Sequence, residues 1–417
     1  MNLLLKLAAV FAAAIFLVGC AQEEVGYPPP TDAFRYPVSV VVGQSGTGAK
    51  TLYVASSNFD LLYNKGTVIA VDLEALDVDG TEETQPLSSL IDPEKGHVTI
   101  DSFAGMMALS STGRLFVTTR SEHKLFAIDA DGGALTCVTP DEKRPKPQRC
   151  AGTKLSKGGV EPTDPYALAF HGGALYLTHG TRPTKGDSYS NALLVRLDPE
   201  TLGGLSYVDI GPAPSEGIIE TPHGLYFSGR AVRNASESLR LLVNGQVMDA
   251  GVTLATGIQE GRGLGVSSDG DRLYMLTRGT RRSSNVPADG PDGLLVLDIS
   301  EDPLTGTAKN QVLGFVPLPE GASQMAVLPR SGRGDLLAIS CTDSDKVVIY
   351  DSDLGVLTAS ADVATPYGIA ALPLDSGGIR LFVASFKEHS VQIIDLEDLA
   401  VPTVLTKRRA LKGASGS

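Results

Sequence analysis

The chain has 417 residues and is acidic, with 35 Lys and Arg against 48 Asp and Glu and a formal net charge of −13 at pH 7. This surplus of carboxylates disfavours nucleic acid and anionic membrane surfaces as partners. Length alone would allow two average domains, so the number of domains must come from the sequence pattern.

The first twenty residues have the features of a targeting segment. Lys6 supplies a positive charge, and residues 7–18 form an apolar run that is too short to span a bilayer as a free helix. Residues 17–20, Leu-Val-Gly-Cys, resemble the lipobox of bacterial lipoproteins. That resemblance implies a signal peptide over residues 1–19 and lipid on Cys20. An ordinary secretory leader that is cut elsewhere is the alternative.

Residues 20–34 are expected to be the lipidated cysteine and a flexible tether, since they are polar and contain Pro28-Pro29-Pro30. Lipid chains would anchor the protein without making it a transmembrane protein. Ala21, rather than Asp, follows the cysteine. The lipobox resemblance therefore implies the cell envelope as the location, with sorting to the outer membrane and the protein facing the periplasm or the surface.

A sequence motif of three short strands recurs seven times over residues 35–406. The middle strand of each copy is rich in β-branched and aromatic residues and is bounded by turn residues, which is typical of antiparallel strands. These middle strands are LYVAS from Leu52, LFVTT from Leu115, LYLTH from Leu175, LYFSG from Leu225, LYMLT from Leu273, LAISC from Leu337 and LFVAS from Leu381. The first strands open at Pro37, Ala104, Pro165, Ser215, Gly261, Ala322 and Pro366, and the third strands end at Asp72, Asp129, Asp198, Asn244, Asp298, Asp351 and Asp395.

An all-β period of roughly 40–60 residues predicts a β-propeller, because one small sheet cannot bury both of its faces and must pack against its neighbours around an axis. We therefore predict an all-β, seven-bladed β-propeller with four-stranded antiparallel blades. The strands resemble the YVTN-repeat propellers from Tyr36 to about Leu405, as in the phrase TPYGIAALPLDSGGIRLFVASFKEHSVQIIDL from Thr365. This resemblance implies the fold and says little about activity. Tryptophan is absent, which argues against the quinoprotein propellers.

The predicted blades differ mainly in their loops. Long second-to-third strand loops occur at 57–66, 179–191 and 277–293, and Asn244-Gly245 is a hairpin turn signal in blade four. The predicted blades span 36–100, 103–138, 164–210, 214–252, 260–318, 321–362 and 365–405. Residues 407–417 are expected to be a disordered tail. Either residues 401–406 or the N-terminal segment could supply the outer strand that closes the ring.

The cysteines and the recurring aspartates have structural interpretations. Cys137 and Cys150 bracket a charged, Pro-rich loop, and in an oxidising compartment we expect them to form a disulfide. Cys341 is expected to be a small buried residue. The aspartate that ends each third strand is expected to accept backbone N–H bonds in the next turn, not to bind metal. No cofactor and no metal site are predicted.

Antiparallel order brings the start of each first strand, the end of each second strand and the long loops to one face of the propeller. The residues just after each opening position should surround the mouth of the central channel: Val38, Gly105, Tyr166, Glu216, Arg262, Ser323 and Tyr367. At the ends of second strands come Arg120, His179, Arg230 and Arg278. Arginine suits carboxylate or phosphate recognition, and tyrosine provides a rigid wall.

Three functions are compatible with this pattern. The first is a binding or scaffolding lipoprotein, expected to be monomeric, that holds a small anionic ligand or a protein partner at Tyr166, Glu216, Arg262 and Tyr367. The second is a lactonase-like hydrolase, with Glu216 as base and Arg262 or His179 stabilising an oxyanion. The third is a structural envelope protein without a ligand, in which Glu216 and Arg262 merely pair with each other.

Overall fold

The computed structural model describes residues 26–44, 48–79, 83–142, 148–182, 184–185, 188–189, 191–229, 239–252, 258–279 and 291–413. Cys20 and the signal segment, as well as Arg230, lie outside the described residues. Strands make up most of the described chain, with two single 3₁₀ turns at Leu87–Ser89 and Thr342–Ser344. Among the described residues, no helix has the length and apolar character needed to cross a membrane.

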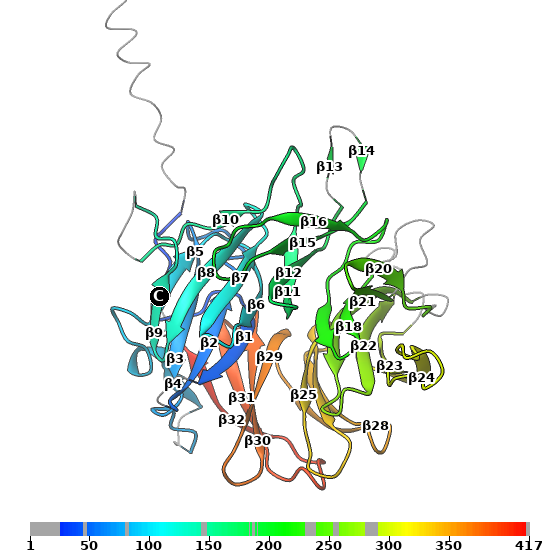
Figure 1. The fold of residues 1–417 in the computed structure, drawn as a ribbon. Helices are drawn as coiled ribbons and strands as arrows, with labels where there is room; N and C mark the ends of the chain where they lie inside the picture. Colours follow the sequence, from blue (N-terminus) through cyan, green and yellow to red (C-terminus); the bar gives the residue numbers. More distant parts are fainter. Residues whose placement is uncertain are drawn as a thin grey trace, which may run out of the picture.

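Seven antiparallel sheets, each built on four strands, are arranged around a central axis, as predicted (Figure 1). The first strands of neighbouring blades contact one another and form the inner ring, and β1 of blade one lies beside β29 of blade seven. The blades are β1 (Pro37–Gln44), β2 (Lys50–Ser56), β3 (Gly66–Asp72) and β5 (His97–Ile100); β6 (Ala104–Leu109), β7 (Arg114–Thr119), β8 (Lys124–Asp131) and β9 (Ala134–Cys137); β11 (Pro165–His171), β12 (Ala174–His179), β15 (Leu193–Leu197) and β16 (Ser206–Asp209); β17 (Ile218–Thr221), β18 (Gly224–Ser228), β19 (Leu239–Val243) and β20 (Gln246–Asp249); β21 (Ile258–Val266), β22 (Arg272–Gly279), β23 (Gly293–Asp298) and β24 (Gln311–Pro317); β25 (Ala322–Leu328), β26 (Leu336–Cys341), β27 (Lys346–Asp351) and β28 (Val356–Asp362); and β29 (Pro366–Pro373), β30 (Ile379–Ser385), β31 (Ser390–Leu396) and β32 (Thr406–Lys412).

The middle strands are buried on both faces because a blade lies on either side of them. Every residue of β12, β18 and β26 is buried, and in β2 only Lys50 is partly exposed. Such strands lose the alternation of apolar and polar residues and become continuous apolar runs. This burial explains why the second line of the repeat is the easiest to recognise in the sequence.

The ring closes through the C-terminal end of the chain. β32 pairs antiparallel with β31 as the outer strand of blade seven, and the short strand β4 (Thr84–Pro86) adds to β32 in parallel. The C-terminal closure that the sequence allowed is therefore confirmed in topology, since each blade takes its four strands from one continuous stretch of chain, but the strand runs over residues 406–412 and not 401–406.

The expected disordered tail is also wrong for residues 407–412, which belong to β32. The basic run in this strand is held by carboxylates. Arg408 contacts Asp395 at 3.0 Å, and Arg409 contacts Asp77 at 2.9 Å. The sequence shows only a run of cations near the end, whereas the acidic partners that order it lie in other turns.

The aspartates that end the third strands act in their turns as predicted. Asp72, Asp198, Asp298 and Asp351 each accept a hydrogen bond from the backbone N–H two residues later, at 2.9 Å in every case. The other two bind arginines of the neighbouring second strand: Asp129 binds Arg114 and Asp395 binds Arg380. The hairpin predicted in blade four is also present, with Asn244 and Gly245 at positive φ between β19 and β20.

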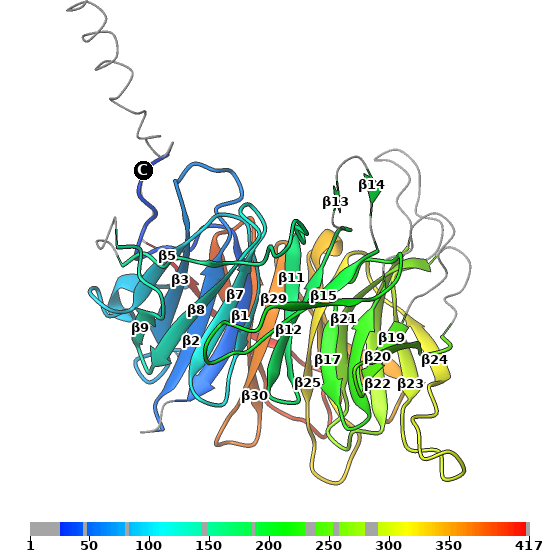
Figure 2. The same ribbon diagram turned by 45° about the horizontal axis from the view of Figure 1, so that its top comes forward.

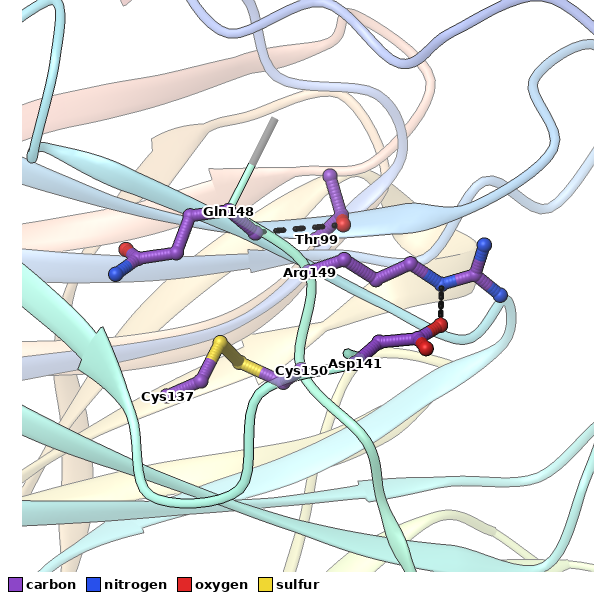
Figure 3. The surroundings of a disulfide bond; sticks show 6 residues. All are labelled: Thr99, Cys137, Asp141, Gln148, Arg149 and Cys150. Atoms are coloured by element: carbon purple, nitrogen blue, oxygen red, sulfur yellow. Dashed lines mark hydrogen bonds and ion pairs between the residues drawn. A yellow bond between two sulfur atoms is a disulfide. The ribbon is translucent and has the colours of Figure 1, made fainter. Parts of the chain in front are cut away.

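Blade two has an interrupted outer strand. β9 pairs with the end of β8, and the two-residue strand β10 (Thr153–Lys154) pairs with its start. Between them lies an inserted loop whose ends are joined by the Cys137–Cys150 disulfide, the pairing expected from the sequence (Figure 3). The disulfide therefore holds together the two halves of one edge strand.

The inserted loop of blade two also contacts blade one. The backbone N–H of Thr99 in β5 donates to the carbonyl of Gln148 at 2.9 Å, and the N–H of Cys150 donates to the carbonyl of Thr99 at 3.0 Å. The Thr99 hydroxyl lies 3.5 Å from the same Gln148 carbonyl (Figure 3). Within the loop, Arg149 pairs with Asp141 at 3.2 Å. These bonds connect the outer edges of two neighbouring blades.

Candidate functional site at the channel mouth

The loops between second and third strands gather on one face of the propeller. The hairpin of β13 (Thr184–Lys185) and β14 (Ser188–Tyr189) belongs to blade three and rises from this face, at the top of Figure 2. The first strands begin on the same face, since they run antiparallel to the second strands that end there. We call it the mouth face.

Two of the predicted residues meet directly across the channel. The hydroxyls of Tyr166 in blade three and Tyr367 in blade seven are 3.0 Å apart, although 201 residues separate them in the sequence. Tyr166 is only 8% exposed, and burial raises the pKa of its phenol. The Tyr166 phenol therefore keeps its proton at physiological pH, and one of the two hydroxyls donates to the other.

Glu216 and Arg262 form an ion pair between blades four and five. Glu216 lies just before β17, and Arg262 also binds Glu260 at 2.5 Å. Burial lowers the pKa of the Arg262 guanidinium, and the nearby Arg278 lowers it further. The pairing that the sequence allowed as an alternative is thus present, and the Glu216 carboxylate is occupied by a cation.

The arginines at second-strand ends mainly hold neighbouring segments together. Arg278 donates to the carbonyls of Ala322 and Gly321 at 2.9 and 2.7 Å, and to the Ser323 hydroxyl. Arg120 pairs with Asp164, yet 45% of its side chain is exposed. Of these two, Arg120 is the cation with more surface available to a ligand.

His179 is a buried neutral imidazole. Its Nδ1 lies 3.0 Å from the carbonyl of Thr163, and an Nδ1–H must donate there because the carbonyl has no proton. Burial lowers the pKa of His179 to about 4, so the ring is neutral at pH 7. Its Nε2 then carries a lone pair, and it has no hydrogen-bond partner among the described residues.

A cavity of about 310 Å³ opens beside the tyrosine pair and is lined mainly by residues of blades one, two and seven, with Tyr166 from blade three and Thr342 and Asp343 from blade six. Its wall contains five aromatic rings, together with Val38 and Met106. Arg120, Lys387 and Asp343 are the charged residues of the lining. The rings are Phe59, Phe103, Tyr166, Tyr367 and Phe386. This cavity is a candidate small-molecule site on the described part of the mouth face.

The aromatic rings of this cavity pack on one another. Phe386 lies 5.5 Å from Phe59, 6.1 Å from Tyr367 and 4.9 Å from Tyr36, measured between ring centroids. Phe59 also contacts Phe103 at 5.8 Å, edge to face. Because Phe59 remains 55% exposed, the cluster presents an apolar surface at the opening of the cavity.

Sequence reasoning placed two of the five rings at the channel mouth and missed the role of the other three. Phe386 directly follows the second strand of blade seven, the position that Arg120 occupies in blade two. Phe103 directly precedes β6 and has a positive φ, as Tyr36 and Asp164 do before their blades. The signal was therefore present in the repeat alignment, where aromatic residues at second-strand ends line the mouth as well as arginine and histidine.

Metal binding receives no support at this site. No group of three or more His, Cys, Asp or Glu side chains within the described ranges is arranged to hold an ion. The cavity wall provides apolar surface, two phenols, the guanidinium of Arg120, the ammonium of Lys387 and the carboxylate of Asp343.

Similar proteins show the fold and no more. No family model matches the chain, and no curated protein matches it. Among solved structures, a hydrazine synthase chain of Kuenenia stuttgartiensis matches with a TM-score of 0.55 and 14% identity, over 92% of this chain and all of that one. A periplasmic gluconolactonase of Pseudomonas aeruginosa matches with a TM-score of 0.50 and 16% identity, over 82% of this chain and 88% of that one. A protein of unknown function from Desulfotomaculum acetoxidans matches with a TM-score of 0.50 and 11% identity, over 82% and 96%. This chain is thus similar in fold to bacterial propellers whose functions differ.

Proposed function

We propose that this protein is a lipid-anchored, monomeric propeller of the cell envelope that binds a small ligand in the aromatic cavity of the mouth face. The observation that carries the proposal is the cavity itself, since five rings from several blades converge on one space next to an exposed arginine. Binding pockets commonly combine an apolar wall with a few polar groups that orient the ligand.

The lining favours an amphipathic anion, meaning an aromatic or aliphatic body that carries one carboxylate. The rings would cover the body, and the exposed part of Arg120 with Lys387 would meet the carboxylate. Arg262 should contribute less to binding the ligand's carboxylate than the sequence suggested, because Glu216 and Glu260 already bind its guanidinium. A cavity of about 310 Å³ is at the small end of the range for ligand sites, so the ligand would be small.

The test is a binding measurement with a matched pair of probes, indole-3-acetate and indole-3-acetamide, which differ in charge and little in shape. We expect the acetate to raise the melting temperature of the purified protein by mass action and the acetamide to have a much smaller effect. Arg120→Gln should weaken the response to the acetate, and Phe386→Ala should weaken binding of both probes. Lys309→Gln, on a distant surface of blade five, serves as the control. Equal binding of both probes, or a response that survives Arg120→Gln, would contradict the proposal.

A lactonase-like hydrolase is the second candidate, and one observation favours it. His179 is neutral with an unpartnered Nε2, which is the state of a general base. Against it, His179 is 1% exposed and the Glu216 carboxylate is paired with Arg262. Hydrolysis of gluconolactone by the purified protein, lost in His179→Gln, would move the assignment from binding to catalysis.

Lipid anchoring at Cys20 rests on the lipobox alone, and membership of the YVTN-repeat family rests on the resemblance of the strands. The wild-type protein should partition with membranes in a bacterial host, and Cys20→Ser should release it.

A protein partner is the remaining alternative to a small ligand. Binding to envelope proteins that is unchanged by Glu216→Ala with Arg262→Ala would favour a purely structural role.

A further inference from the structure

A second cavity, of about 530 Å³, lies on the face opposite the mouth, between blades five and six. It is bounded by the β21–β22 turn, by residues 330–335 that lead into β26, and by the β27–β28 turn. These connections join first to second strands, or third to fourth, so they lie at the other end of the blades from the channel mouth. Unlike the aromatic cavity, this one has a predominantly polar lining.

Three hydrogen-bond donors in this cavity have little or no protein acceptor. The hydroxyls of Tyr274 and Ser352 are buried and lie near each other, but neither makes a hydrogen bond of good geometry in the described structure. The hydrogen bond from the Arg272 guanidinium to the carbonyl of Ser352 is long, at 3.3 Å. Leaving a buried hydroxyl unpaired costs about 1–3 kcal/mol, so orphaned donors in a cavity wall point to an acceptor that is supplied from outside.

The same three residues lie close together. Arg272 reaches Ser352 directly, and both influence the ionisation of Tyr274. Burial raises the pKa of the Tyr274 phenol, so the hydroxyl keeps its proton at neutral pH and can donate it in a hydrogen bond. A guanidinium with two adjacent hydroxyls is a suitable arrangement for one carboxylate.

The other charges of the lining are already satisfied or are acceptors. Arg330 is held by Asp351 and Asp353, and Asp335 accepts both the N–H and the hydroxyl of Ser268 at 2.7 Å. Asp269 is exposed, and its Oδ1 accepts from the N–H of Asp271. Carboxylates at the rim disfavour a multiply charged anion such as phosphate, but they accept hydrogen bonds readily from hydroxyl groups.

Gly334 shapes the wall where Ser352 lies. A side chain at this position would meet the Ser352 Oγ and an Asp353 oxygen, each at 2.5 Å from the added Cβ. The absent side chain therefore lets residues 330–335 lie directly on the β27–β28 turn. That close approach buries the Ser352 hydroxyl and closes one side of the cavity.

We propose that this cavity binds a carboxylate-bearing polyol, such as a sugar acid, with its carboxylate on Arg272, Tyr274 and Ser352 and its hydroxyls toward Asp269 and Asp353. Such a ligand fits the single cluster of unpaired donors and the acceptors around it. A free uronate and the terminal uronate of a glycan share this chemistry. The proposal does not depend on the function assigned to the mouth face.

Isothermal titration of the full-length protein with D-glucuronate, with D-glucose as the neutral probe, tests the proposal. We expect saturable binding of glucuronate and at least tenfold weaker binding of glucose. Arg272→Gln should reduce the affinity for glucuronate at least tenfold. Tyr274→Phe should reduce it about fivefold without loss of stability, because the change removes a hydroxyl that makes no hydrogen bond of good geometry in the described structure. A parallel titration with trigalacturonate distinguishes a free uronate from the terminal uronate of a glycan. Tighter binding of the oligomer than of glucuronate would indicate a glycan ligand.

Two controls keep the outcome interpretable. Arg196→Gln removes an exposed arginine of blade three and should leave glucuronate binding unchanged. Arg120→Gln alters the mouth face and should also leave it unchanged, which separates this proposal from the function proposed above. Equal affinity for glucose and glucuronate, no binding of glucuronate or trigalacturonate, or undiminished glucuronate binding by Tyr274→Phe would overturn the proposal.

Discussion

Replacing Asp351 by Asn should destabilise the protein by about 3 kcal/mol, which is large for one atom exchanged in a turn. Asp351 is fully buried at the end of β27. Its two oxygens bind the Arg330 guanidinium at 2.8 and 2.9 Å, and Oδ1 also accepts the backbone N–H of Asp353. The substitution keeps the shape and removes the charge that balances a guanidinium whose side chain is 3% exposed.

The magnitude follows from what remains around Arg330. Losing one partner of a buried pair costs about 3–5 kcal/mol because a charge is left uncompensated. Arg330 retains the carbonyls of Gly334 and Leu399, at 2.6 and 3.2 Å, and the carboxylate of Asp353 at 3.2 Å. Those contacts offset part of the loss, so we expect the lower end of that range.

Urea unfolding of matched variants provides the assay. Asp72→Asn alters the equivalent turn of blade one, where the carboxylate is exposed and accepts the N–H of Glu74, so it should cost less than about 1 kcal/mol. The double variant Arg330→Met with Asp351→Asn should recover much of the loss, because no unpaired charge remains. A destabilisation by Asp351→Asn no larger than that of Asp72→Asn would refute the reasoning.

Three further predictions concern other parts of the fold. Removing the disulfide with Cys137→Ser and Cys150→Ser should lower stability by about 2–4 kcal/mol, measured by urea unfolding, and reductant should then have no further effect. Lysine hydrogen bonds, chiefly from Lys124, outweigh the effect of burial and lower the pKa of Asp101, so its contribution is complete above about pH 4 and is lost as the pH falls below that value. The difference in unfolding free energy between the wild type and Asp101→Asn should therefore shrink between pH 5 and pH 3. Gly217→Ala should strongly lower the melting temperature, because its new methyl group would overlap a backbone carbonyl of blade five.

The fold could be predicted because the repeat signals its own geometry. Burial of the middle strand on both faces, as in β26, and a turn-forming aspartate after the third strand both follow from the propeller architecture. The outer strands were harder to assign, because they pack on one side only and carry few apolar residues. In β32 the ordering contacts come from Asp395 and Asp77, which are distant in sequence, so the basic run appeared to be a disordered end.

The candidate site was predicted in position and only partly in chemistry. The repeat alignment placed Tyr166 and Tyr367 around one channel mouth, and in the structure their hydroxyls lie 3.0 Å apart. Whether Arg262 is available to a ligand depends on distances between side chains, and a sequence read one blade at a time does not contain them. The second cavity was not predicted, because its residues lie in short turns between strands, whereas the sequence pattern pointed to the face of the long loops.

The two cavities illustrate how a propeller can separate chemistries on one chain. At the mouth, charged groups that converge on the axis, such as Glu216 and Arg262, lie near enough to pair with each other, so recognition falls to the aromatic rings. On the opposite face the short turns of two blades meet edge to edge, and Arg272 is not matched by a carboxylate in the described structure. Since a blade strand of about seven residues spans roughly 20 Å, a ligand in one cavity would not contact the other. An apolar site and a polar site can therefore coexist on the rigid ring without competing for the same side chains.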